Sequence, residues 1–286
     1  MFCLPHINGS SLITFFCLFG MTVDSVSGEP AVPAESNVVR IAILGDSTVC
    51  NFDPAKSELR GWGQVLPDYF MRPQVEVINC ALSGRSSKSF ILEGHWQKVL
   101  KLSPAPNYIF IQFAANDIIG KGPLRETLPG EVPVQLPAEG VGSDPKDWYR
   151  NNIRTYIEQS RSIGAIPIMV TSMERPQFRD AVPLRKTLPY AEAAITVAKQ
   201  MNVAVIDLGA YSCAVYSKLG LQGCDFMHVY KNGKIESHYC EAGARVWAEF
   251  IIEQLAKSTP GLKPFIALPA QKVIDQKLHP AESGGK

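Results

Sequence analysis

Three short segments of this sequence carry the groups that acyl transfer requires. Ser47, which follows Gly45-Asp46, offers a hydroxyl, Gly84 offers a backbone N–H, and Asn116 offers a side-chain amide. A serine hydroxyl can attack a carbonyl carbon, and preorganised N–H donors bind the oxyanion that forms. The three segments therefore predict chemistry on an acyl group, provided that the fold brings them together.

The group still needed is a base that accepts the serine proton. Of the five histidines, His6 belongs to the N-terminal leader, His279 to the C-terminal tail and His95 to a predicted helix, which leaves His228 and His238. We expect His238 in a loop between the last strand and the last helix. From that loop its imidazole is expected to reach the serine hydroxyl.

Five short apolar runs, rich in Val and Ile, predict the strands that hold these groups. The runs are 38–45, 75–79, 108–113, 166–171 and 203–207. Runs that are apolar on both faces are typical of a buried parallel sheet. Helical patterns with one apolar face alternate with them, among them 149–160, 188–201 and 244–255. The fold class predicted is α/β, a three-layer α/β/α sandwich around a five-stranded parallel sheet.

The position of the polar segments on this sheet matters for function. Ligands of an open parallel sheet bind beyond the carboxyl ends of the strands. Ser47, Gly84 and Asn116 each follow one of the first three predicted strands. We therefore expect all three to face one crevice.

One segment breaks the alternation of strand and helix. Residues 120–147 contain five prolines and five glycines and show neither a helical nor a strand period. Loops of this length are usually functional or disordered, and we predict an insertion that overhangs the ligand edge of the sheet. Trp148, beside the insertion, is a candidate for substrate contact. The folded domain is placed at 38–258 and a C-terminal tail at 259–286.

The first 37 residues are predicted to precede the domain. An apolar run at 12–23, followed by small residues, is typical of a signal peptide. We predict a signal peptide at 1–27, a flexible lead-in at 28–37, and a secreted or periplasmic protein. The run is shorter than the roughly 20 residues of a membrane span, so no stable membrane insertion is expected after cleavage.

Composition and cysteine content narrow the class of protein. With a net charge of +1 and 19% charged residues, the chain lacks the excess positive charge that is typical of nucleic-acid-binding proteins. Nucleic-acid binding is therefore not predicted. Five cysteines follow the leader, and Cys213 with Cys224 or Cys240 are the candidate disulfide pairs in an exported protein. No C-x-x-C or His-rich spacing indicates a zinc site, so neither a metal nor a cofactor is predicted.

Four motifs, in their order along the chain, resemble the SGNH (GDSL) hydrolase family. Gly45-Asp46-Ser47 resembles the first block of that family, Asn79 to Gly84 the second, Asn116-Asp117 the third and His238 the fifth. Flanking segments resemble its rhamnogalacturonan-acetylesterase branch. They are Gly61-Trp62-Gly63-Gln64, 84–90 and Glu93-Gly94.

The resemblance implies the flavodoxin-like SGNH hydrolase fold and a metal-free serine esterase. Such an enzyme removes acetyl groups from a pectic or other polysaccharide through an acyl-enzyme. By position, Ser47 is the implied nucleophile and His238 the general base and then acid. The implied oxyanion hole consists of the Ser47 N–H, the Gly84 N–H and the Asn116 amide.

The chain departs from the family pattern at two places. Ala114 and Ala115 stand where the third block normally has Gly-His, and Ile235 stands where the fifth block has Asp, three residues before the histidine. Isoleucine cannot accept a hydrogen bond. Glu236 is the candidate carboxylate in its place, and a backbone carbonyl could hold the imidazole tautomer instead.

Several alternatives stay open on the sequence alone. Asp225 and His228 have the same Asp-x-x-His spacing and form a second candidate acid and base pair. Ser47 could simply cap a helix. The chain could also be a catalytically weak or inactive relative that binds carbohydrate without cleaving it, or a lipase or thioesterase that prefers long acyl chains.

Overall fold

The computed structural model describes residues 38–278. The predicted signal peptide (1–27) and the predicted lead-in (28–37) lie outside the described residues. The end of the predicted tail (279–286) lies outside them as well.

The centre of the domain is a five-stranded sheet in the order β2-β1-β3-β4-β7. Its strands are β1 (Val39–Leu44), β2 (Val75–Asn79), β3 (Tyr108–Ile111), β4 (Ile166–Val170) and β7 (Ala204–Ile206). Every pairing is parallel. Each strand falls within one predicted apolar run, so the predicted five-stranded parallel sheet is confirmed. All carboxyl ends meet at one edge of the sheet, where the loops after β1, β2 and β3 begin.

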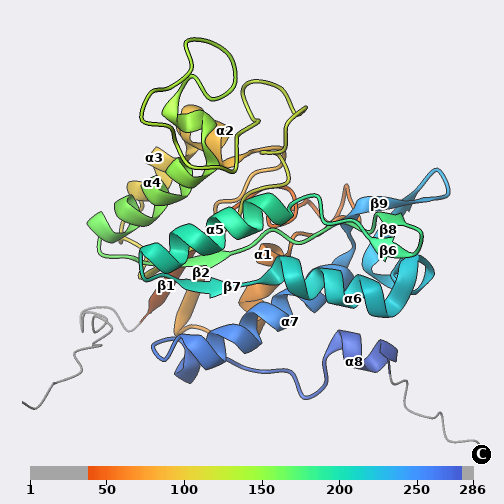
Figure 1. The fold of residues 1–286 in the computed structure, drawn as a ribbon. Helices are drawn as coiled ribbons and strands as arrows, with labels where there is room; N and C mark the ends of the chain where they lie inside the picture. Colours follow the sequence, from red (N-terminus) through yellow and green to blue (C-terminus); the bar gives the residue numbers. More distant parts are fainter. Residues whose placement is uncertain (1–37, 279–286) are drawn as a thin grey trace, which may run out of the picture. The chain divides into compact units, whose positions relative to one another are not determined.

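Helices cover both faces of the sheet (Figure 1). One face packs against α1 (Trp62–Val65), α6 (Leu208–Gly223) and α7 (Glu241–Ser258). The other packs against α2 (Ser87–Leu92), α3 (His95–Leu100), α4 (Tyr149–Ser162) and α5 (Leu188–Gln200). The predicted three-layer sandwich is therefore confirmed.

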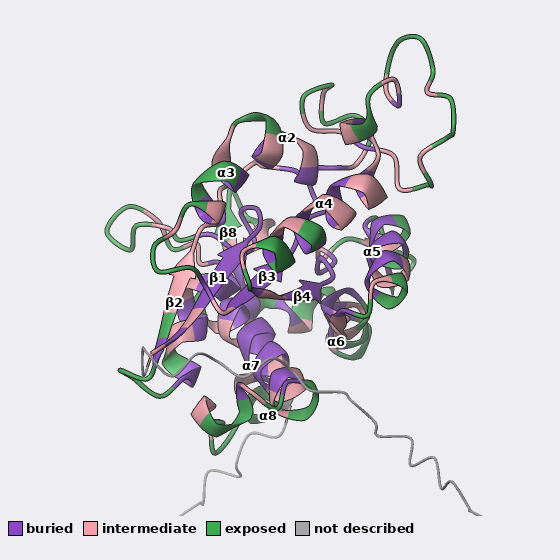
Figure 2. Ribbon diagram, turned by 90° about the vertical axis from the view of Figure 1, so that its left-hand side faces the viewer, coloured by how far each residue is buried: buried purple, intermediate pink, exposed green. Residues whose placement is uncertain are grey.

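The side-chain alternation of β1 shows why both faces need cover. Ile41 and Ile43 point into the core on the α7 side, and Ala42 and Leu44 point into the core on the α4 side. Successive side chains of a strand face opposite sides of the sheet, so a strand apolar throughout must be buried between two layers. Figure 2 shows the inner strands β1, β3 and β4 buried.

Short elements complete the domain. They are η1 (Leu66–Tyr69), η2 (Pro145–Asp147), β5 (Phe178–Arg179), β6 (Val182–Pro183), η3 (Asp225–Met227), β8 (His228–Lys231), β9 (Lys234–Tyr239), η4 (Lys263–Phe265) and α8 (Val273–Leu278). The described part of the predicted tail packs on the domain, because Leu262 is buried in the core and Ile266 forms a β-bridge with Phe70. No helix in the described part of the chain combines the length and the apolar character needed to cross a membrane.

The segment predicted as a loop before the last helix is instead a β-hairpin. β8 and β9 pair antiparallel and join through Asn232 and Gly233, which have φ values of 52° and 72°. Asn-Gly is the preferred dipeptide for such a turn because both central residues need positive φ. His238 therefore lies on a strand, β9, and α7 begins three residues later.

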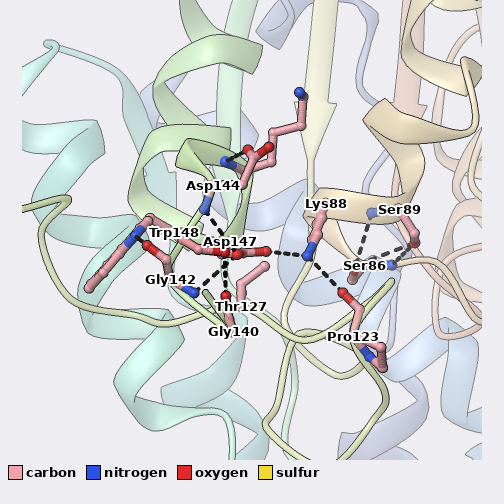
Figure 3. A network of polar contacts seen from close by, with 12 residues as sticks. Ser86, Lys88, Ser89, Pro123, Thr127, Gly140, Gly142, Asp144, Asp147 and Trp148 are labelled. Carbon is pink, nitrogen blue, oxygen red and sulfur yellow. Dashed lines mark hydrogen bonds and ion pairs between the residues drawn. The ribbon is translucent and has the colours of Figure 1, made fainter. Parts of the chain in front are cut away.

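The predicted insertion at 120–147 is anchored to the helix layer above the sheet. Lys88 of α2 forms an ion pair with Asp147 and donates to the Pro123 carbonyl at 2.7 Å (Figure 3). Asp147 also accepts from the N–H of Gly142 at 3.0 Å. The indole N–H of Trp148 donates to the Gly142 carbonyl at 3.0 Å. One buried ion pair thus closes a long loop against α2 and the start of α4.

Candidate active site

The turn after β1 is built around the buried Asp46. Its Oδ1 accepts hydrogen bonds from the N–H and the hydroxyl of Thr48, both at 2.8 Å, and its carbonyl accepts from the N–H of Val49 and Cys50. The alternative that Ser47 caps a helix does not hold, because Asp46 makes the contacts that close this turn. The Ser47 hydroxyl is therefore not used to hold the turn, although its residue is only 6% exposed.

Helix α1 packs closely against this turn. A Cβ on Gly61 would overlap the backbone of Val49, and one on Gly63 would lie 2.7 Å from the Val49 carbonyl oxygen. The Trp62 indole donates to Gln112 at 2.8 Å, and Gln112 in turn donates to the Thr48 hydroxyl at 2.8 Å. The Gly-Trp-Gly segment thus lets α1 approach closely enough to fix the turn that carries Ser47.

The hydroxyl of Ser47 and the imidazole of His238 lie in direct contact. The distance from His238 Nε2 to Ser47 Oγ is 2.8 Å, across 191 positions of sequence. A base must lie within hydrogen-bond reach of the proton that it removes. The geometry is that of a serine nucleophile paired with a histidine base.

Three contacts hold the β9 backbone on which His238 lies. Arg175, in the loop after β4, donates from Nη1 to the Ser237 carbonyl at 2.8 Å. The N–H of Arg60 donates to the Tyr239 carbonyl at 2.9 Å. His228 Nδ1 lies 3.1 Å from the His238 carbonyl. The base is therefore positioned through its main chain on both sides.

The electrostatic surroundings favour a neutral His238. Burial, together with a smaller effect from the positive charge of Arg175, lowers its pKa to about 4, and the negative charge of Glu236 opposes both. The group is therefore uncharged at neutral pH, as a general base must be before it accepts a proton.

No carboxylate accepts a hydrogen bond from His238 among the described residues. Its Nδ1 lies 3.4 Å from the Ser237 hydroxyl. Ile235 pairs with Tyr230 of β8 and offers no acceptor, and the ladder is irregular between this pair and the pair of Tyr239 with His228. Glu236 acts on His238 through its charge and not through a hydrogen bond. The structure thus places the predicted stand-in near the ring without a direct contact.

The two remaining predicted donors lie on neighbouring loops. Asn116 donates from its side-chain amide to the Arg85 carbonyl at 3.1 Å, which ties it to the turn that contains Gly84. Gly84 has a φ of 80°, a conformation that glycine adopts without strain. Within residues 38–278, the backbone N–H groups of Ser47 and Gly84 donate to no protein acceptor. Both are available to an oxyanion.

Asp117, next to Asn116, joins the loops behind these donors. It accepts from the Ser87 hydroxyl at 2.5 Å and from the Thr127 hydroxyl at 3.0 Å. Burial raises its pKa to about 7. This contact set was not predicted from the sequence, and it links α2, the third block and the insertion.

The alanine replacements in the third block introduce no backbone strain. Ala114 and Ala115 are both buried, and neither is among the described residues with positive φ. A glycine is required only where φ is positive or the approach is very close. Alanine therefore fits this turn.

The second candidate pair lies apart from the serine. His228 is 4% exposed, with Nδ1 at 3.1 Å from the His238 carbonyl and Nε2 at 3.3 Å from the Tyr216 hydroxyl. The structure brings His238, not His228, to the Ser47 hydroxyl. Trp148 packs in the anchor of the insertion, against Gly142 and Leu128, and does not line the pocket beside the candidate site.

The cysteines form no pair in the described part of the chain. Cys50, Cys80, Cys213, Cys224 and Cys240 are all free thiols. Cys224 donates to the Gly220 carbonyl and Cys240 to the Phe226 carbonyl. The candidate disulfides of Cys213 are therefore not formed in this structure.

The model of the GDSL-like lipase/acylhydrolase family matches residues 43–229, which contain the turn of Ser47 and the donors Gly84 and Asn116. The chain belongs to this family. His238 lies beyond the matched residues, so its assignment rests on the geometry.

Relatives of this GDSL-like chain include two proteins of Bacillus subtilis. A probable rhamnogalacturonan acetylesterase, YesY, is 28% identical over 212 residues, which are 74% of this chain and 89% of the relative. Rhamnogalacturonan acetylesterase RhgT is 29% identical over 226 residues, 75% of this chain and 88% of the relative. The predicted family and its rhamnogalacturonan-acetylesterase-like branch are confirmed, as is the prediction of a carboxylic ester hydrolase of the SGNH type.

A solved structure shows the same fold. The crystal structure of YxiM from Bacillus subtilis superposes with a TM-score of 0.62 at 24% identity and covers 78% of this chain. The GDSL-like chain spans 58% of that longer protein. The likeness supports the SGNH hydrolase fold predicted for the domain.

Proposed function

We propose that this chain is an exported serine esterase that removes O-acetyl groups from a pectic-type polysaccharide through an acyl-enzyme. The observation that carries the proposal is the 2.8 Å contact between Ser47 Oγ and His238 Nε2 at the carboxyl edge of the sheet. Asn116 and Gly84 lie on neighbouring loops of the same edge and supply donors for an oxyanion.

The proposed reaction has two halves. In the first, His238 Nε2 accepts the proton of Ser47 as the serine oxygen attacks the acetyl carbonyl carbon. The N–H groups of Ser47 and Gly84 and the amide of Asn116 stabilise the oxyanion. The C–O bond to the sugar then breaks, and the sugar oxygen leaves with the proton from His238.

In the second half, water replaces the sugar. His238 takes a proton from the water as the water oxygen attacks the acetyl-serine carbonyl. Breakdown of the second tetrahedral intermediate releases acetate and returns the proton to Ser47. A neutral imidazole is needed at the start of each half. Burial and, to a smaller extent, the charge of Arg175 lower the pKa of His238 and so favour its neutral form.

The substrate class is supported by the relatives. YesY and RhgT carry the name rhamnogalacturonan acetylesterase, and the segments of this chain that resemble that branch surround Ser47 and Gly84. Export is supported by the signal-peptide pattern of residues 1–27. Fractionation of expressing cells, with N-terminal sequencing of the mature chain, tests export, and an uncleaved intracellular product would contradict it.

The decisive experiment compares the wild type with Ser47→Ala on p-nitrophenyl acetate and on acetylated pectin. We expect Ser47→Ala to lose at least about 10³-fold in kcat/KM, because the covalent step is gone. Ser258→Ala, an exposed serine at the end of α7, is the matched control and should behave as the wild type. A mass spectrum of the wild type quenched during turnover should show an acetyl adduct on Ser47.

The outcomes separate the competing functions. Equal acetate release by wild type and Ser47→Ala would overturn the proposal. Retention on acetylated pectin without any acetate release would indicate a carbohydrate-binding relative. Faster hydrolysis of long-chain p-nitrophenyl esters than of the acetate would indicate a lipase or thioesterase.

A further inference from the structure

A pocket of about 170 Å³ opens beside the candidate catalytic residues. It is lined by Ala115, Ile118, Lys121, Glu174, Arg175, Gln177, Leu184, Lys186 and Thr187. Ala115 directly precedes the oxyanion-hole candidate Asn116, and Arg175 binds the Ser237 carbonyl next to His238. The pocket is therefore adjacent to the segments that carry Asn116 and His238.

The lining of this pocket is cationic. Lys121, Arg175 and Lys186 oppose the single carboxylate Glu174. Within residues 38–278, none of the three cations forms an ion pair, whereas Arg85, in the loop before α2, and Lys88 of α2 are each paired with an acid. Unpaired like charges gathered in a hollow raise the local concentration of anions.

Glu174, the single acid of the lining, has a buried carboxylate. The residue is 1% exposed, and its Oε2 accepts from the Thr187 N–H at 3.2 Å. Its Oε1 is buried and has no partner among the described residues. Buried polar atoms without a partner are rare because they cost free energy. Because this carboxylate is buried and burial raises its pKa, it offers the pocket little negative charge to oppose the three cations.

We propose that this pocket binds an anionic sugar unit adjacent to the acetylated one. The anionic group lies among Lys121, Lys186 and Arg175. The inference rests on the proposed function and assigns the binding of the negative charge of the substrate to these residues of the pocket. The anion is the carboxylate of a uronate or a sulfate ester, which offer the same acceptor oxygens to the cations.

The test measures kcat/KM for three oligosaccharides of matched length. They are an acetylated galacturonate oligomer, an acetylated sulfated galactan oligomer and the neutral acetylated xylan oligomer. We compare the wild type, the double variant Lys121→Ala/Lys186→Ala and the control Lys257→Ala, an exposed lysine at the far end of α7. In the double variant we expect the ratio of acidic to neutral kcat/KM to fall about tenfold, mostly through KM, since exposed pairs contribute modestly.

Ionic strength supplies an independent measurement. In the wild type, KM for the acidic substrate should rise with salt while KM for the neutral substrate stays constant, because screening weakens exposed charge pairs. The double variant should lose this salt dependence, and Lys257→Ala should keep it. A greater loss on one anionic substrate identifies uronate or sulfate as the preferred group.

The proposal is overturned if the wild type shows no preference for acidic substrates, or if the double variant keeps the wild-type ratio. Such an enzyme would still release acetate from the neutral oligomer, so the esterase function would stand. Failure of the wild type on all three substrates and on p-nitrophenyl acetate would instead count against the esterase function itself.

Discussion

The serine half and the histidine half of the site are built in different ways. Ser47, Gly84 and Asn116 follow strands of the central sheet, and the turn of Ser47 is locked by close packing of α1. His238 lies on a two-stranded hairpin outside that sheet and is held through backbone contacts. The fold therefore fixes the nucleophile through close packing against the sheet, and it fixes the base through hydrogen bonds to the backbone of β9, whose last residue, Tyr239, is buried.

This difference indicates where catalytic power is limited. In a serine hydrolase triad, loss of the carboxylate behind the histidine costs roughly 10⁴-fold, while the oxyanion hole and binding retain roughly 10³- to 10⁴-fold over water. The serine half here is complete in its donors, and the histidine half has no carboxylate hydrogen bond. We expect a serine esterase whose rate is set by the orientation of His238.

The largest expected effect distinguishes the two histidines. His238→Ala should lower kcat/KM at least about 10³-fold, and adding Ser47→Ala should lower it no further because the two act as one unit. His228→Asn should keep kcat/KM within tenfold but reduce the free energy of unfolding by about 2 kcal/mol, since buried partners lose hydrogen bonds. Acetate release measures kcat/KM, and urea denaturation measures the free energy of unfolding. If His228→Asn lost more activity than His238→Ala, the assignment of the base would be reversed.

A smaller effect is expected where α1 supports the serine half. In Gly61→Ala the new Cβ overlaps the Val49 backbone, so overpacking should cost about 2 kcal/mol. For a domain of this size that lowers Tm by about 4 to 8 °C. The turn of Ser47 should shift as well, with a fall in kcat. Gly164→Ala, at a position without neighbours but with a φ of 80°, should lower Tm without the loss of kcat.

The pH profile tests the electrostatics of the histidine half. With a His238 pKa of about 4, kcat/KM should rise through pH 4 and stay level above about pH 6. Arg175→Met removes a positive charge that disfavours imidazolium, so the pKa should rise toward 6.5 and the variant should lose most at pH 5. Arg179→Met, an exposed arginine of β5, is the control. An acid limb that does not move in Arg175→Met would contradict the role of that charge.

The smallest effect is expected at Glu236. Its charge raises the pKa of His238, but it makes no hydrogen bond to the ring. Glu236→Gln should therefore lower kcat/KM only about two- to fivefold and move the acid limb to lower pH. Glu192→Gln, exposed on α5, serves as the matched control. A loss of 10³-fold in Glu236→Gln would instead show that this carboxylate completes a triad during turnover.

The two halves also differ in how far the sequence could predict them. Ser47 and Asn116 follow buried strands with an unambiguous apolar pattern, so both their chemistry and their edge of the sheet were predictable. The β8–β9 hairpin was missed although Asn232-Gly233 is a strong local signal for such a turn. Helix α6 was missed as well, since it contains the glycines Gly209 and Gly220, and its backbone is non-helical at the second.

Contacts between distant loops were beyond prediction. The hydrogen bond of Arg175 to the Ser237 carbonyl depends on how the loop after β4 meets β9, and no local pattern encodes that distance. The same holds for Asp117, whose partners come from α2 and from the insertion. Each of these residues has an ordinary sequence neighbourhood, and only the tertiary arrangement gives it a role.

The contact between Ser47 and His238 joins residues 191 positions apart, and this separation affects biogenesis. The nucleophile leaves the ribosome long before its base exists, so a nascent or prematurely terminated chain has a serine without a partner. Hydrolytic competence appears only when the hairpin near the end of the domain docks on the first strand's turn. Acetate release can thus report, in a refolding or translation experiment, the moment at which the whole domain closes.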